Sequence, residues 1–123
     1  MTTRHCIQRA IAFGFLCSVV MVARPVSALD ADAAQTLARQ SGCLQCHAVD
    51  KLKVGPAYRD VAAKYKGNAD AEAKLIHHVT SGERAKFPDG HEEDHQIVKT
   101  KDPAAIKNLV DWILSLEGGT KPP

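Results

Sequence analysis

Two cysteines and a histidine stand in the order Cys43-Leu44-Gln45-Cys46-His47. The pattern is C-x-x-C-H, in which two thiols can add to the two vinyl groups of one haem while the next residue falls under the iron. A neutral imidazole nitrogen of His47 can bind that iron. Covalent attachment and one axial ligand are therefore both expected from these five residues.

Residues 1–28 are typical of a secretory signal peptide. Arg4 and Arg9 give a positive start, residues 11–23 form an apolar run, and Val26-Ser27-Ala28 ends in small residues. The apolar run falls short of the roughly 18 residues that a membrane-spanning helix needs. We therefore predict export to the periplasm, with residues 29–123 forming one domain that has no stable membrane anchor.

Charge and cysteine content change when this leader is set aside. It holds three of the 16 basic residues and none of the 14 acidic ones, so 13 basic residues remain and the domain has a net charge of about −1. A near-neutral charge gives no reason to expect nucleic acid binding. Cys6 and Cys17 also leave with the leader, so Cys43 and Cys46 are the only cysteines of the domain.

The cysteine pair has three other interpretations: a structural disulfide, a thioredoxin-like redox pair, or half of a zinc site. A zinc ribbon needs a second cysteine pair, which residues 29–123 do not contain. A thioredoxin-like pair needs a βαβ setting, and no segment alternates with period two for long enough to predict a strand. The adjacent histidine and the export signal favour haem attachment.

The elements that must position the motif are helical. Apolar residues recur at helical spacing in four segments, each with a start and a stop signal. These segments run from Asp30 or Asp32 to Gly42, from Tyr58 to Gly67, from Asp70 to Gly82, and from Asp102 to Gly118-Gly119. The polar stretch from Glu83 to Lys101 has no sustained period and contains the turn signal Phe87-Pro88-Asp89-Gly90. We expect an all-α domain of four main helices around one covalently bound haem, with one long loop.

Four blocks extend the pattern beyond the motif: Gly42 to Ala48, Val54 to Tyr58, Asp60 to Tyr65, and Trp112 to Ser115. In content, order and, up to Gly82, spacing, the domain resembles the small monohaem class I cytochromes c of bacteria, the c-551 type. The resemblance implies the class I cytochrome c fold and one haem c, with its iron, per chain. It also implies electron transfer to transient redox partner proteins, with no enzymatic activity.

The resemblance also implies roles for single residues. His47 should be the proximal ligand, with its other ring nitrogen donating to the backbone carbonyl of Pro56, a bond that fixes the tautomer. His78 falls where the family often places a polar side chain beside a haem propionate. The alternative for His78 is an exposed helix histidine with no partner.

The sixth ligand of the haem iron must differ from the one that is usual in the family. That ligand is normally a methionine in the loop before the last helix, but here the only methionines are Met1 and Met21, both in the leader. The loop is about four residues longer than in the family. The position that holds the methionine in the family falls near His91 when residues are counted forward from Gly82. It falls near His95 when they are counted back from Trp112. We predict bis-histidine ligation by His47 and His95, with His91 as the alternative to His95.

Two other interpretations of the loop stay open. It could be a solvated acidic segment, or it could bind a divalent metal at low affinity. If neither histidine reaches the iron, the iron would be five-coordinate or closed by Lys86, Lys99 or another side chain. If histidine replaces methionine, the reduction potential should fall, because methionine ligation raises it. Electron transfer is the expected function; the alternative is a haem-based ligand-binding or sensor protein with a displaceable sixth ligand.

Overall fold

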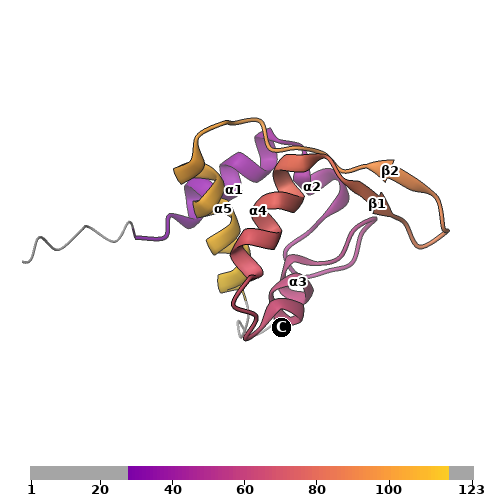
Figure 1. The fold of residues 1–123 in the computed structure, drawn as a ribbon, viewed down its shortest axis with the longest axis horizontal. Coiled ribbons are helices and arrows are strands. Elements are labelled where there is room, and N and C mark those ends of the chain that lie inside the picture. The colour runs from indigo at the N-terminus through magenta and orange to yellow at the C-terminus, as the bar shows by residue number, and fades with distance from the viewer. Residues whose placement is uncertain (1–27, 117–123) are drawn as a thin grey trace, which may run out of the picture.

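The computed structural model describes residues 28–116, which form five helices and one two-stranded sheet (Figure 1). The predicted signal peptide, except Ala28, and the predicted stop at Gly118-Gly119 lie outside the described residues. The elements in chain order are α1 (Ala31–Gln40), α2 (Cys43–Cys46), α3 (Tyr58–Tyr65), α4 (Ala71–Ser81), β1 (Arg84–Lys86), β2 (Glu92–Asp94) and α5 (Pro103–Ser115). Four of the helices are those expected from the sequence, and α2 is an extra turn of helix formed by the cysteine motif itself.

Local signals set the ends of the first and last helices. The Asp30 carboxylate accepts a hydrogen bond from the amide of Ala33 at 2.9 Å, and the Asp102 carboxylate accepts one from the amide of Ala104 at 3.0 Å. Each satisfies a helix-start donor that has no partner within the helix. Gly42 follows α1 with φ +79°, a left-handed conformation that glycine adopts without strain. The motif therefore begins directly after a sharp stop.

The start of α4 differs from the expectation. Asp70 occupies the position before the helix, but its side chain makes no capping hydrogen bond. Its carboxylate instead lies 3.7 Å from the ammonium of Lys74, one helical turn along. Asp70 therefore contributes an exposed ion pair to the first turn rather than the predicted cap.

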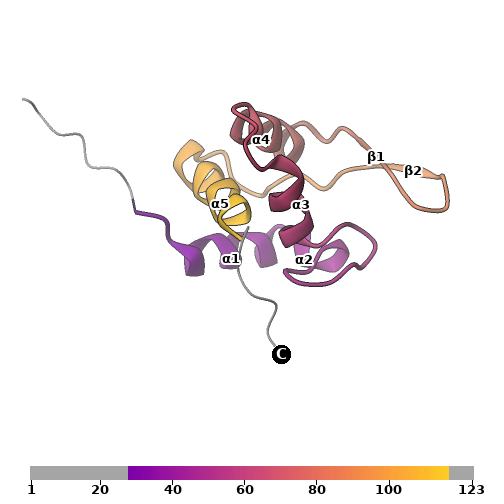
Figure 2. The ribbon, with the colours of Figure 1, turned by 90° about the horizontal axis from the view of Figure 1, so that it is seen from below.

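The core is organised around α5, which packs against α1, α3 and α4 (Figure 2). Leu109 and Val110 on α5 are fully buried among apolar side chains of the other helices. Trp112 meets the ring of Tyr58 edge to face, with centroids 5.6 Å apart. This contact joins α5 to α3 directly behind the cysteine motif. Among residues 28–116, no helix has the length and apolar character required to cross a membrane.

The prediction that no strand would form is wrong. β1 and β2 pair antiparallel, with Arg84 opposite Asp94 and Lys86 opposite Glu92. Their side chains are mostly exposed and charged, so the hairpin has no alternating apolar pattern that could reveal it. The predicted turn at residues 87–90 is confirmed, since the amide of Gly90 donates to the carbonyl of Phe87 at 3.0 Å.

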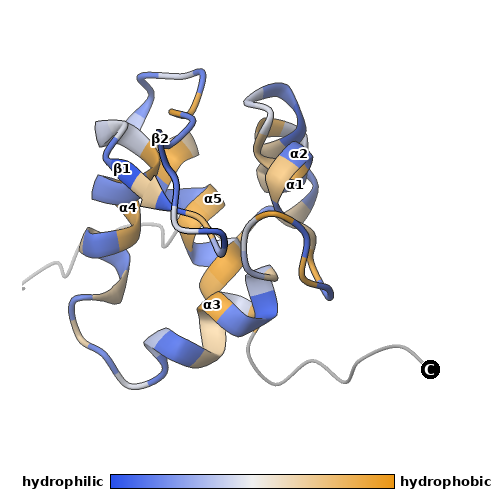
Figure 3. Ribbon diagram, turned by 90° about the vertical axis from the view of Figure 1, so that its right-hand side faces the viewer, coloured by the Kyte–Doolittle hydropathy of each residue, from blue (hydrophilic) through white to orange (hydrophobic). Residues whose placement is uncertain are grey.

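The hairpin projects from the helical body on the side of the motif (Figure 1). Figure 3 looks onto that face: α1 and α2 lie on one side of the view, and α4 with the hairpin on the other. The long loop of the sequence prediction is therefore partly ordered, and it stands opposite the cysteine motif.

Candidate functional site

The cysteine motif forms a single helical turn. α2 begins at Cys43, ends at Cys46, and is followed by His47 in an extended conformation. Both cysteines are half-buried, and they form no disulfide with each other. Burial raises the pKa of the Cys43 thiol, so this group is protonated at neutral pH. Two thiols on one turn, followed at once by an imidazole, are free to form two thioether bonds.

The ring of His47 is held on two sides. Its Nδ1 donates to the backbone carbonyl of Pro56 at 2.8 Å, the hydrogen bond that the family resemblance implied. Tyr58 stacks on the ring with centroids 5.3 Å apart and planes 17° from parallel. Because Nδ1 carries the proton, Nε2 keeps a lone pair that can bind a metal. Burial lowers the pKa of His47, which also favours the neutral form.

Gly55 leaves room for this ring. A Cβ atom at position 55 would lie 2.5 Å from Cε1 and 2.8 Å from Nδ1 of His47, closer than real Cβ contacts come. In the sequence, Gly55 stands only as one member of the block Val54 to Tyr58. Its role in fitting the backbone against the imidazole depends on a contact between loop and ring, which sequence spacing does not reveal.

His95 lies across from His47. The ring centroids are 6.1 Å apart and the planes are inclined by 55°. A metal–imidazole nitrogen bond is about 2 Å and the nitrogen lies about 1 Å from the ring centre, so two imidazoles on opposite sides of one metal have centroids roughly 6 Å apart. The Nδ1 atom of His95 is buried and has no hydrogen-bond partner within residues 28–116. A buried ring nitrogen without a hydrogen-bond partner in the protein leaves this imidazole available to a bound group.

His91 is held elsewhere. It stands at the far end of the hairpin, where its ring stacks on Phe87 with centroids 4.3 Å apart. Its Nδ1 pairs with the carboxylate of Asp89, and its Nε2 lies 3.5 Å from Glu93. Within the described residues, no group of three or more His, Cys, Asp or Glu side chains is placed to hold a metal ion. The hairpin therefore brings His95, rather than His91, to the ring of His47.

His78 lies next to His95, with ring centroids 4.0 Å apart. Its Nδ1 donates to the carboxylate of Glu83 at 2.5 Å. The interpretation of His78 as a helix histidine without a partner is therefore wrong, while its place beside a propionate stays a prediction. His77, the preceding residue on the helix, is exposed and lies 3.6 Å from the same carboxylate.

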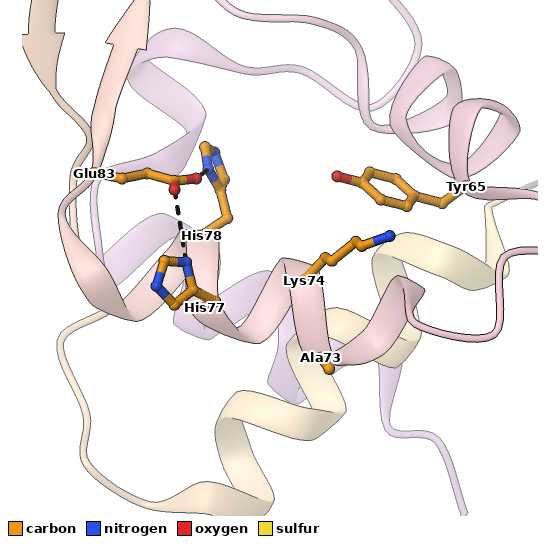
Figure 4. Close-up of a pocket in the computed structure, with 6 residues that line it drawn as sticks. All are labelled: Tyr65, Ala73, Lys74, His77, His78 and Glu83. Carbon is orange, nitrogen blue, oxygen red and sulfur yellow. Dashed lines mark hydrogen bonds and ion pairs between the residues drawn. The ribbon is translucent and has the colours of Figure 1, made fainter.

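A pocket of about 400 Å³ opens between α3 and α4 beside His78 and Glu83 (Figure 4). Its lining residues are Tyr65, Ala73, Lys74, His77, His78 and Glu83. The sequence did not single out Glu83, because its contacts with the histidines arise only when the chain turns back at the end of α4.

The site thus combines the thiols of Cys43 and Cys46 with the imidazole of His47, which Gly55 leaves room for. The imidazole of His95 lies at the distance expected if both rings bound one metal ion. These residues fit a haem that is attached through Cys43 and Cys46.

Comparisons with known proteins agree with this site. Residues 31–117 match the sequence model of the cytochrome c family. The chain is 44% identical to cytochrome c-551 of Allochromatium vinosum, over 65% of this chain and 82% of that protein. It is 46% identical to cytochrome c-551 of Pseudomonas aeruginosa, over 66% of this chain and 74% of that protein.

Solved structures give the same result. The class 1 cytochrome MtoD from Sideroxydans lithotrophicus ES-1 shares 69% identity with a TM-score of 0.69, over 72% of this chain and 98% of that chain. Cytochrome c552 of Nitrosomonas europaea shares 32% identity with a TM-score of 0.54, over 68% of this chain and 99% of that chain. The chain therefore belongs to the cytochrome c family, as a class I electron-transfer protein with one covalently attached haem c.

Proposed function

We propose that this protein is a periplasmic electron carrier whose haem iron is bound by His47 on one side and His95 on the other. The observation that carries the proposal is the 6.1 Å separation of the two ring centroids, the spacing of two imidazoles on one metal. A second support is that the chain holds no methionine beyond Met1 and Met21, so residues 28–116 offer no thioether side chain for this position.

Different residues of the chain would hold different parts of the haem. Cys43 and Cys46 would anchor the cofactor, and Pro56 keeps the proton of His47 on Nδ1 so that the lone pair of Nε2 is available to the iron. When bound, the haem supplies one-electron chemistry between Fe(III) and Fe(II). His78 would contact a haem propionate through Nε2, since its Nδ1 is already engaged by Glu83.

Two histidine ligands should give a lower reduction potential than a histidine and a methionine. Axial ligand identity is a main determinant of haem potential, and methionine raises it. The periplasmic location rests on the leader in residues 1–28, with its arginines, apolar run and small-residue end. There the protein would exchange electrons with redox partner proteins in short-lived complexes.

Carbon monoxide separates this proposal from the ligand-binding alternative. A carrier whose sixth ligand stays bound in both redox states should react slowly with carbon monoxide when reduced. It should also titrate at a potential below that of a methionine-ligated cytochrome c-551 measured in the same buffer. Rapid carbon monoxide binding would point instead to a sensor with a displaceable ligand, and an equally high potential would contradict bis-histidine ligation.

A further inference from the structure

His95 is fixed at the base of the hairpin by its main chain. Its amide donates to the backbone carbonyl of Glu83 at 3.0 Å, which extends the β1–β2 ladder by one residue pair. Farther along, the amide of Val98 donates to the carbonyl of Val79 on α4 at 2.9 Å. Residues 84–94 therefore form a hairpin that is closed at its base by Glu83 and His95. At His95 the chain is back at the C-terminal end of α4, where the hairpin began.

The side chain of Glu83 acts at the same place. Its carboxylate accepts the hydrogen bond from Nδ1 of His78 at 2.5 Å and lies 3.6 Å from Nδ1 of His77 (Figure 4). One residue thus holds the backbone of His95 with its carbonyl and the ring of His78 with its carboxylate. Hydrogen bonds to a charged acceptor are stronger than neutral ones, so the orientation of His78 is well defined.

The ring of His78 in turn supports the ring of His95. Their centroids lie 4.0 Å apart with the planes inclined by 44°, which is van der Waals contact between two imidazoles. His95 faces His47 on one side and His78 on another. The His78 ring restricts the directions in which the His95 side chain can turn away from the position opposite His47.

We propose that Glu83 and His78 are positioning residues that hold His95 in place as the sixth ligand. This inference rests on the proposed bis-histidine ligation. A ligand on an exposed hairpin base binds the metal best when its backbone and ring are oriented in advance, because less conformational freedom is then lost on binding. Glu83 fixes the backbone and, through His78, the ring.

Reduced, haem-loaded full-length protein mixed with saturating carbon monoxide tests this directly. Under those conditions the observed rate reports how fast the sixth ligand leaves the iron. Glu83→Ala and His78→Ala should each raise the rate about tenfold, the change expected when one hydrogen bond to a charged group is lost. Glu83→Gln should give a rate between those of wild type and Glu83→Ala, because the amide oxygen can still accept from His78 but carries no charge.

Control variants make each outcome decisive. His77→Ala removes a neighbour of Glu83 that does not contact the His95 ring, and it should leave the rate unchanged. His78→Phe keeps a flat ring beside His95 without the bond to Glu83, and its rate should fall between those of wild type and His78→Ala. His78→Phe also replaces His78→Ala in the comparison if the alanine variant fails to fold.

The inference is overturned if His95→Ala binds carbon monoxide rapidly while Glu83→Ala and the folded His78 variants keep the wild-type rate. In that case bis-histidine ligation stands and only the support is lost. If His95→Ala itself keeps the wild-type rate, the proposed ligation fails instead.

Discussion

The rings of His47 and His95 face each other with centroids 6.1 Å apart, although one follows the cysteine motif and the other closes a hairpin far along the chain. His47 is fixed by Pro56 and Tyr58, while His95 is fixed by Glu83 and His78. If both imidazoles bind the iron as proposed, the ligand set does not change with redox state, so electron transfer needs little reorganisation.

Replacing His95 by methionine should raise the reduction potential. The His95→Met variant places a thioether at the base of the hairpin, and a histidine–methionine pair gives a higher potential than two histidines. A redox titration of the variant beside wild type measures the change. His91→Met is the control and should titrate like wild type, because His91 is stacked on Phe87 at the far end of the hairpin. If His91→Met gave the higher potential and His95→Met did not, the ligand assignment would be reversed.

Adding a methyl group at Gly55 should disturb His47. The new Cβ in Gly55→Ala would lie 2.5 Å from Cε1 of the ring, so the ring or the loop must shift. We expect a loss of about 1–3 kcal/mol in the free energy of unfolding and an altered haem spectrum. Chemical denaturation followed by absorbance measures both.

Gly67→Ala is the matched control for this steric effect. Gly67 has φ +70°, and a Cβ atom added there would have no neighbouring atom within 4 Å, so its cost of about 1 kcal/mol comes from the backbone alone. Its haem spectrum should match wild type. A Gly55→Ala protein with wild-type stability and spectrum would show that Gly55 does not shape the site.

The Ser41 hydroxyl joins α1 to the segment before α5. Ser41 is fully buried, and its Oγ accepts a hydrogen bond from the amide of Lys99 at 3.0 Å. Ser41→Ala leaves that amide unpaired, so the free energy of unfolding should fall by about 1–3 kcal/mol. Thr36→Ala removes an exposed hydroxyl on α1 that accepts from the Arg39 side chain at 3.1 Å, and it should change this free energy by less than about 0.5 kcal/mol. Equal effects of the two substitutions in urea denaturation would contradict the assigned role of Ser41.

Stability should fall as the pH drops below about 6.5, the ordinary histidine value. Burial lowers the pKa of both His47 and His95 in the folded protein. Below about pH 6.5 the unfolded chain then binds more protons than the folded one, so the free energy of unfolding decreases with falling pH. Binding of either imidazole to iron acts in the same direction, because the ligand must be deprotonated. Denaturation midpoints at about pH 7.5 and about pH 5.5, on either side of the ordinary histidine value, test this, and a midpoint that rises on acidification would contradict it.

The helices could be predicted because their signals are local. Asp30, Gly42 and Asp102 act within one turn of the helix ends that they define, and the apolar stripe of α5 repeats at helical spacing. The hairpin could not be predicted from apolar alternation, because Arg84 of β1 pairs with Glu92 and Asp94 of β2 through exposed charges.

The site could be predicted only in part for a related reason. The cysteine motif and the bond from His47 to Pro56 follow from short spacings and from the family pattern. The contact of Glu83 with His95 forms only when the hairpin closes, so counting residues left both His91 and His95 open. In the fold, His95 lies near His47 at the base of the hairpin, while His91 is stacked on Phe87 at its far end, and this difference is why His95 is the proposed ligand.

The most direct test of bis-histidine ligation is the absorption spectrum of the oxidised and reduced protein, including the near-infrared charge-transfer region, for wild type, His95→Ala and His91→Ala. We expect a low-spin bis-histidine spectrum for wild type and His91→Ala, and a high-spin spectrum for His95→Ala. A His95→Ala protein that stays six-coordinate with an unchanged spectrum, while His91→Ala turns high-spin, would contradict the ligation by His47 and His95.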